Sequence, residues 1–191
     1  MHFNNHSDLS GKHAYISASS NSWLNYSPAK FKEVYLNNLA KQEGTELHAL
    51  ASENIKHRIK VSPHVKHAFY QFVNDAIGFR MDSEQVLYYS PYCFGTADAI
   101  SFTQQDNGRM LLRIHDLKTG KVPVKHFNQL DVYAALFCLE YQVNPEEIDI
   151  VQRLYQFSTY TENVPDPLEI QGIMNKIVQM DEVLLKLTEE G

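Results

Sequence analysis

The chain has 191 residues, of which 43% are hydrophobic and 21% are charged, and its formal net charge at pH 7 is −6. These values are typical of a globular domain and exclude wholesale disorder and collagen-like repeats. The two cysteines, Cys93 and Cys138, form no CxxC pair, which excludes a four-cysteine zinc or iron–sulfur site within one chain. An acidic chain does not call for nucleic acid as a partner, so any nucleic-acid site must be a local basic cleft.

The first 80 residues are predicted to be mainly helical. Residues 15–19 (YISAS) suggest a short extended entry. Ser27-Pro28 is typical of a helix start, because serine caps the free N–H groups and proline suits the first helical position. Apolar residues at helical spacing predict helices over about 30–42 and 45–58, interrupted at Gly44, and a third from about 62 to 78.

Strand patterns dominate the second part of the chain. Asn107-Gly108 is the strongest short hairpin signal, and it separates two β-prone segments. We expect strands at 86–89, 93–102, 110–117 and 148–157, helices at 125–141 and 166–189, and a loop at 158–166. This order predicts a single α/β (α+β) domain over residues 1–191, with a mixed central β-sheet (84–157) flanked by helices.

Two aspartates and a lysine are the candidate catalytic group. Asp98 and Asp116 lie on strands joined by the Asn107-Gly108 turn, so the hairpin can bring both carboxylates to one end of the sheet. Asp116 and Lys118 are two residues apart and therefore face the same side of a strand. Convergent carboxylates suit Mg²⁺ or Mn²⁺, and a lysine beside them suits phosphodiester hydrolysis.

An Asp-x-Lys pair on a strand is, in most proteins, only a solvated surface pair. Here Ile114 and Leu117 indicate that the strand is buried, so Asp116 needs a partner or a metal ion. The small residues 95–97 before Asp98 leave room for a ligand. These neighbours favour a functional site.

Five segments in this order resemble the PD-(D/E)XK nuclease superfamily, in its RecB-like and Cas-four-like branch, and especially the short phage-encoded exonucleases of that branch. The resemblance covers most of the chain and implies a restriction-endonuclease-like fold. The matching segments are 15–28, 44–48 (GTELH), 95–98 (GTAD), 116–118 (DLK) and 129–133 (QLDVY).

The resemblance implies roles for individual residues. The metal ion, Mg²⁺ or Mn²⁺, would be bound by His48, Asp98, Asp116 and the backbone carbonyl of Leu117, and Lys118 would be catalytic. The last segment resembles the QxxxY motif, in which Gln129 and Tyr133 share one helical face and contact DNA or orient Lys118. Two lysines between these motifs, Lys121 and Lys125, are the better candidates for contacts to the DNA backbone.

In one respect the chain departs from many members of this branch. Those proteins bind an iron–sulfur cluster through four cysteines, the first of which lies just before the proline where this chain has Ser27-Pro28. The other three lie near the C-terminus, where residues 145–191 contain no cysteine. We therefore expect no iron–sulfur cluster.

The function implied is a metal-dependent deoxyribonuclease, namely a phage exonuclease in DNA recombination, replication or degradation. DNA, single-stranded or with double-stranded ends, would be its partner, together with a single-strand annealing protein, and a homo-oligomer is compatible with the resemblance. A non-catalytic DNA-binding or assembly module on the same fold and an endonuclease are the alternatives. Polarity of digestion, strand preference, oligomeric state, physiological metal and pathway stay open.

A cytoplasmic location is expected, in the host cytoplasm if the protein is phage-encoded. The sequence contains no apolar run of about 20 residues, the length that a membrane-spanning helix needs. Residues 1–10 are polar and histidine-bearing, unlike the apolar region of an export signal.

Overall fold

A computed structural model describes residue 16 and residues 22–65 and 67–189 of the chain. Internal contacts divide the chain into two compact units, residues 1–42 and 43–191. Apart from Ile16, the extended entry predicted at residues 15–19 lies outside the described residues.

The first unit contains the start of the longest helix. A 3₁₀ helix (η2, Ser22–Asn25) precedes helix α1 (Pro28–Lys56), which continues into the second unit. The Oγ atom of Ser27 accepts a hydrogen bond from the backbone N–H of Lys30 at 3.2 Å. Ser27 therefore caps α1 and Pro28 is its first residue, which confirms the helix start predicted from Ser27-Pro28.

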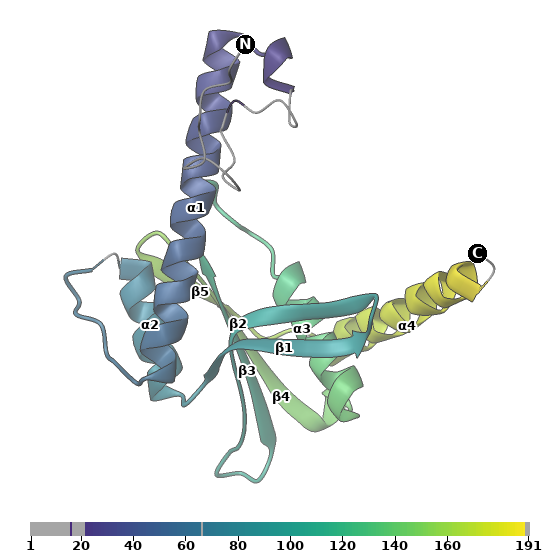
Figure 1. Cartoon of the computed structure of the whole chain (residues 1–191). Coiled ribbons are helices and arrows are strands. Elements are labelled where there is room, and N and C mark those ends of the chain that lie inside the picture. Colours follow the sequence, from purple (N-terminus) through teal and green to yellow (C-terminus); the bar gives the residue numbers. More distant parts are fainter. Residues whose placement is uncertain (1–15, 17–21, 66, 190–191) are drawn as a thin grey trace, which may run out of the picture. The chain divides into compact units, whose positions relative to one another are not determined.

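Within the second unit, the described residues form a sheet with helices on both faces (Figure 1). The strands are β1 (Asp82–Ser90), β2 (Cys93–Gln104), β3 (Met110–Lys118), β4 (Ile148–Gln156) and β5 (Thr159–Asn163). The other elements are α2 (His67–Gly78), α3 (Asn128–Tyr141), the 3₁₀ helix η3 (Pro145–Glu147) and α4 (Pro167–Glu189).

The sheet is mixed, as the sequence predicts. Its strand order is β1-β2-β3-β4-β5, and β3 and β4 are parallel while the other neighbours are antiparallel. The parallel pair follows from the long connection through α3, because adjacent parallel strands need a crossover. The turn at Asn107-Gly108 joins β2 to β3, and Gly108 has a φ of +83°, which suits glycine.

Two apolar cores lie on opposite faces of the sheet. Helices α3 and α4 pack on one face, and the larger core there includes Leu112, Leu130 and Ile170. Residues 47–56 of α1 and helix α2 cover the other face, with Ala99 and Leu117 from the strands. Each large aliphatic side chain buried in this way contributes about 1.5–3 kcal/mol to stability.

Gly44 does not interrupt the helix, contrary to the prediction, and α1 runs through it without a break. A Cβ atom at residue 44 would lie 2.6 Å from Oγ1 of Thr119, the residue that follows β3. Glycine therefore permits the close approach of α1 to the end of β3. The cost of a glycine inside a helix, about 1 kcal/mol relative to alanine, is offset by the packing of Ala51 and Ile55.

Two helices begin later in the structure than predicted, α2 by five residues and α3 by three. Helix α2 begins at His67 and not near residue 62, because the side-chain amide of Asn74 pairs with both the N–H and the C=O of Val61 and thereby fixes a non-helical segment before α2. Helix α3 begins at Asn128 and not at 125. The residues before it are bound to the side chain of Gln156.

The loop predicted at residues 158–166 is wrong in part, because it contains strand β5. The chain reverses at Phe157, whose φ of +57° makes the tight turn that places β5 antiparallel to β4. Phe157 is neither glycine nor asparagine, so the sequence carries no turn signal there.

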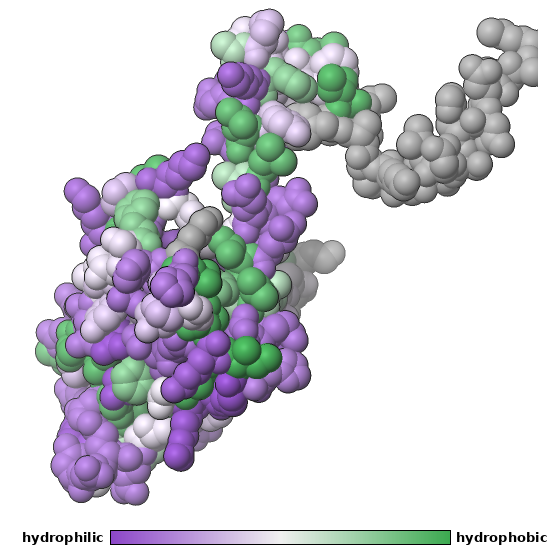
Figure 2. All heavy atoms as spheres, turned by 90° about the vertical axis from the view of Figure 1, so that its left-hand side faces the viewer, coloured by the Kyte–Doolittle hydropathy of each residue, from purple (hydrophilic) through white to green (hydrophobic). Residues whose placement is uncertain are grey.

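Hydrophilic residues dominate the face of the second unit that carries α2, and hydrophobic residues are scattered among them (Figure 2). None of the helices that the structure describes is both long and apolar enough to span a lipid bilayer.

Candidate active site

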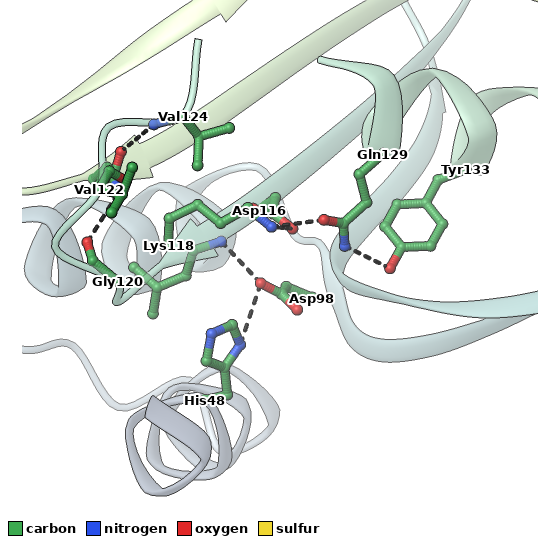
Figure 3. Close-up of polar contacts among 11 residues, drawn as sticks. His48, Asp98, Asp116, Lys118, Gly120, Val122, Val124, Gln129 and Tyr133 are labelled. Carbon is green, nitrogen blue, oxygen red and sulfur yellow. Dashed lines mark hydrogen bonds and ion pairs between the residues drawn. The ribbon is translucent and has the colours of Figure 1, made fainter. Parts of the chain in front are cut away.

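The candidate active site lies where β2 separates from β3. The β2–β3 pairing ends at Ala99 and His115. The residues of β2 before Ala99 pair only with β1, and the residues of β3 after His115 pair only with β4. The last residues of β3 therefore have no strand on the β2 side, and side chains from α1 and α3 can reach them there. Side chains from these elements converge at this corner (Figure 3).

Asp116 and Lys118 form the centre of the group and face the same side of β3, as predicted. The Nζ atom of Lys118 donates a hydrogen bond to Oδ1 of Asp116 at 3.1 Å and lies 2.9 Å from Oδ2. Asp116 is only 1% exposed. Burial raises the pKa of Asp116, and the negative charge of Asp98 raises it further, while Lys118 lowers it.

Helix α3 holds the lysine from the other side. Lys118 Nζ donates to Oε1 of Gln129 at 2.6 Å, and Nε2 of Gln129 donates to the hydroxyl oxygen of Tyr133 at 2.9 Å. Gln129 and Tyr133 are four residues apart and share one helical face, as the sequence predicts. Burial raises the pKa of the Tyr133 hydroxyl, which therefore stays neutral.

The ring of Tyr133 lies against the backbone of β2. A Cβ atom at Gly95 would be 2.9 Å from Cε1 of the ring. The first residue of the 95–98 segment is therefore a glycine because the aromatic ring of the QxxxY segment occupies the space of a side chain.

Asp98 connects β3 to α1. Its Oδ2 atom accepts a hydrogen bond from the backbone N–H of Leu117 at 2.8 Å and lies 3.3 Å from Nδ1 of His48. The N–H and C=O of one strand residue point to the same side, so the carbonyl of Leu117 also faces this corner. The contact with Asp98 raises the pKa of His48, and it outweighs the burial of the ring.

Glu84 is a member of this group that the sequence analysis missed. Strand β1 places it opposite Asp98, because Ser83 pairs with Ala99 and Gln85 with Ala97. One possible ligand atom from each of His48, Glu84 and Asp98 lies within 4.8 Å of the other two. Glu84 is exposed, but partial desolvation of its carboxyl group raises its pKa, and Asp98 adds to this effect. In the sequence Glu84 follows Asp82 and Ser83 as one more polar residue, and only the register of the hairpin singles it out.

In the β1–β2 hairpin, the side chains of β2 change from one face of the sheet to the other at the same point. Ala97 packs in the core under α3, whereas Ala99 packs in the core under α1 and α2. Residues two apart on a regular strand face the same side, so β2 changes faces at Asp98. Its neighbour Glu84 has a φ of +52°, a left-handed conformation that non-glycine residues rarely adopt. This change of face directs the side chain of Asp98 towards α1, where it contacts His48.

The connection between β3 and α3 carries the two predicted DNA-binding lysines. Lys121 and Lys125 are both exposed. The buried side chain of Gln156 holds this connection: its amide donates to the carbonyls of Gly120 and Val122 and accepts from the N–H of Val124, at 2.8–2.9 Å. The lysines lie on a tethered segment, but outside the hydrogen-bonded group of Asp116, Lys118, Gln129 and Tyr133.

The donor set at this corner fits Mg²⁺ or Mn²⁺. Carboxylate and carbonyl oxygens are hard ligands that both ions prefer, and Mn²⁺ accepts an imidazole nitrogen more readily. Oδ2 of Asp116 is buried, and its contact with the described residues is the ion pair with Lys118 Nζ at 2.9 Å, without a hydrogen bond. A buried carboxylate oxygen in this state is suited to a cation.

No family model, curated protein or solved structure matches this chain significantly.

Proposed function

We propose that the protein is a metal-dependent deoxyribonuclease that hydrolyses phosphodiester bonds, as the resemblance to PD-(D/E)XK nucleases implies. One observation carries the proposal. The ammonium group of Lys118 is held between the buried carboxylate of Asp116 and the amide of Gln129, beside a second carboxylate, Asp98, and an imidazole, His48. A surface Asp-x-Lys pair would need neither the burial nor the amide.

The metal ion would be bound by the carboxylates of Asp98 and Asp116, the carbonyl of Leu117 and the imidazole of His48. When bound, a divalent cation lowers the pKa of a coordinated water and neutralises charge on phosphate oxygens. The burial of Asp116 keeps this charge interaction strong, because the local dielectric constant is low.

Lys118 would stabilise the negative charge that develops on the phosphate oxygens, and it would orient the attacking water. Gln129 fixes the position of the ammonium group, and Tyr133 in turn fixes the amide of Gln129. A hydrogen-bonded ammonium group needs little reorganisation during the reaction, which is the physical advantage of this arrangement.

DNA is the proposed substrate, and the backbone of the strand would follow the connection that carries Lys121 and Lys125. The resemblance extends the proposal to an exonuclease in phage or host DNA recombination, replication or degradation, with a single-strand annealing partner. With two exposed cations on this connection, DNA binding should be weak and only moderately salt-dependent.

The test is degradation of end-labelled linear and closed-circular DNA, single- and double-stranded, with Mg²⁺, Mn²⁺ or EDTA. The Lys118→Ala variant should lose metal-dependent cleavage. The Lys60→Ala variant, which lacks an exposed lysine outside the candidate site, should keep it. Loss of linear DNA alone identifies an exonuclease, and cutting of circles identifies an endonuclease. Binding of DNA without cleavage under any metal would contradict the enzyme and leave a non-catalytic DNA-binding module.

A further inference from the structure

The corner of the sheet contains one more metal-ligating side chain than the sequence motifs supply. We propose that Glu84 of β1 is a ligand of a divalent cation that His48 and Asp98 bind with it. This inference deepens the proposed function and rests on it for the assignment of the corner as a nuclease centre. It adds a residue from an element, β1, that contributes no motif.

The spacing of the three side chains supports a shared cation. In octahedral coordination at about 2.1 Å from the ion, adjacent ligands lie about 3 Å apart and opposite ligands about 4.2 Å apart. One ligand atom from each of His48, Glu84 and Asp98 lies within 4.8 Å of the others. Small side-chain rotations therefore suffice to bring all three atoms to one ion.

The three residues come from three different elements. His48 is on α1, Glu84 on β1 and Asp98 on β2. Glu84 and Asp98 lie between the pairs Ser83–Ala99 and Gln85–Ala97 of the hairpin, and like charges on neighbouring strands destabilise a sheet. A cation between them turns this repulsion into an attraction.

The charge balance at the corner calls for a cation. Glu84, Asp98 and Asp116 carry three carboxylates. The ammonium group of Lys118 is already held by Asp116 and Gln129. The imidazole of His48 lies 3.3 Å from Oδ2 of Asp98 and binds a metal ion in its neutral form. The three carboxylates outnumber the one ammonium group, which suits a divalent ion.

A second observation, independent of the cluster itself, points the same way. Asp116 is 1% exposed, and its Oδ2 atom is in an ion pair with Lys118 Nζ at 2.9 Å but accepts no hydrogen bond from the described residues. Buried carboxylate oxygens usually accept at least one hydrogen bond, so this atom retains an unused lone pair for a cation. The negative charge of Asp98 is felt at this carboxylate, so a cation at the corner would compensate both groups.

The decisive experiment measures Mn²⁺ binding to the full chain by the loss of the electron paramagnetic resonance signal of free Mn²⁺. Glu84→Gln keeps the shape of the side chain and removes its charge. We expect Mn²⁺ binding to weaken by about 100-fold or more, which exceeds the roughly 10–100-fold loss caused by removal of an outer-shell partner of a metal ligand. Glu84→Asn, which tolerates a left-handed backbone, should show the same loss.

Asp82→Asn is the matched control. Like Glu84, Asp82 is exposed, and it lies two positions earlier on β1, where it lines a depression with Leu87 and Phe102 on the α3 side. The Mn²⁺ affinity of Asp82→Asn should stay within about twofold of wild type, because Asp82 is not in the His48, Glu84 and Asp98 group and its charge is screened by water and salt. An equal loss in Asp82→Asn and Glu84→Gln would reduce the effect of Glu84 to general electrostatics and overturn the proposal.

A double-mutant cycle tests whether Glu84 and His48 bind the same ion. The losses from Glu84→Gln and His48→Gln should not add, since residues that share one partner are energetically coupled. Two bound Mn²⁺ ions per chain, one weakened by each substitution, would place the two residues at separate sites and contradict the proposal. Thermal unfolding provides a readout independent of binding. Without metal, Glu84→Gln should be at least as stable as wild type, because repulsion from Asp98 is removed, and Mn²⁺ should raise its melting temperature less.

The outcomes separate this inference from the proposed function. Mn²⁺ binding that depends on Glu84, in a protein that cleaves no DNA, would support the ligand and contradict the nuclease. Metal-dependent cleavage with unchanged Mn²⁺ affinity in Glu84→Gln would support the nuclease and overturn the ligand. Absence of Mn²⁺ binding in the wild type at millimolar concentration would overturn the ligand as well.

Discussion

The ammonium group of Lys118 donates a hydrogen bond to the side-chain amide of Gln129 at 2.6 Å, while it also contacts the carboxylate of Asp116. A lysine paired only with Asp116 would lean towards that carboxylate and lose its position towards a substrate. The amide from α3 keeps the ammonium group between the two elements. This contact makes Gln129 a positioning residue whose effect can be measured.

Removal of the Gln129 amide should slow cleavage without abolishing metal binding. We expect Gln129→Ala to lower the single-turnover rate by about 100-fold, the effect that a misplacement of about 1 Å can have on a reacting group. Mn²⁺ affinity should be unchanged. Gln171→Ala, which removes an amide paired four residues along α4 with Asn175, is the matched control. A rate equal to wild type in Gln129→Ala would show that Lys118 needs no support from α3.

The contact between Gly95 and Tyr133 predicts opposite signs for two glycine substitutions. Gly95→Ala places a Cβ atom 2.9 Å from a rigid ring and should destabilise the fold by about 1–3 kcal/mol, as overpacking does. Gly172→Ala in α4 meets nothing within 4 Å and should stabilise by up to about 1 kcal/mol through helix propensity. Urea denaturation measures both. Equal stabilisation by the two would mean that Tyr133 moves freely.

The effect of Gly44→Ala on stability should differ between the wild type and a Thr119→Ala variant. In the wild type, the helix propensity gained by Gly44→Ala is opposed by the contact with Oγ1 of Thr119 at 2.6 Å. In a Thr119→Ala background that oxygen is absent, so Gly44→Ala should add about 1 kcal/mol of stability. The cycle is read from the denaturation midpoints of the four proteins. Equal effects in both backgrounds would show that Thr119 rotates away at no cost.

The hydrogen bonds from Gln156 to residues 120–124 should affect DNA binding more than the rate of the cleavage step. Gln156→Ala breaks three hydrogen bonds to residues 120–124 and frees the segment that carries Lys121 and Lys125. We expect a higher KM for DNA with a nearly unchanged kcat, and a loss of about 1–3 kcal/mol in stability from the unpaired backbone groups. A drop in kcat at unchanged KM would instead link the tether to Lys118, its partner across the β3–β4 pair.

Burial of Cys138 predicts a loss of stability in mild alkali. Burial raises the pKa of the Cys138 thiol to about 11. Between the ordinary thiol pKa of about 8.5 and this value, the unfolded chain releases a proton that the folded chain retains, so stability falls as pH rises. The fall should be shallower in Cys138→Ala than in wild type, when denaturation is measured from pH 8 to pH 11. Cys93→Ala, at a half-buried thiol, should change the slope less.

Much of the site follows from short sequence spacings. The separation of two residues on a strand places Asp116 beside Lys118, and a separation of four on a helix places Gln129 beside Tyr133. The Asn107-Gly108 turn sets β2 antiparallel to β3 and brings Asp98 to the same edge. Each of these relationships is local or depends on one tight turn, so the sequence alone determines it.

Other features depend on contacts between segments far apart in the chain, and only the tertiary structure decides them. Glu84 lies close to His48 and Asp98 because of the register of β1 on β2 and a left-handed backbone at Glu84 itself. Neither feature can be predicted from a sequence pattern. Gly44 predicts a break in isolation, but the nearby Thr119 makes it a packing residue within a continuous helix. The physical reason is the same in both cases: local propensity is worth about 1 kcal/mol or less per residue, and packing across the sheet overrides it.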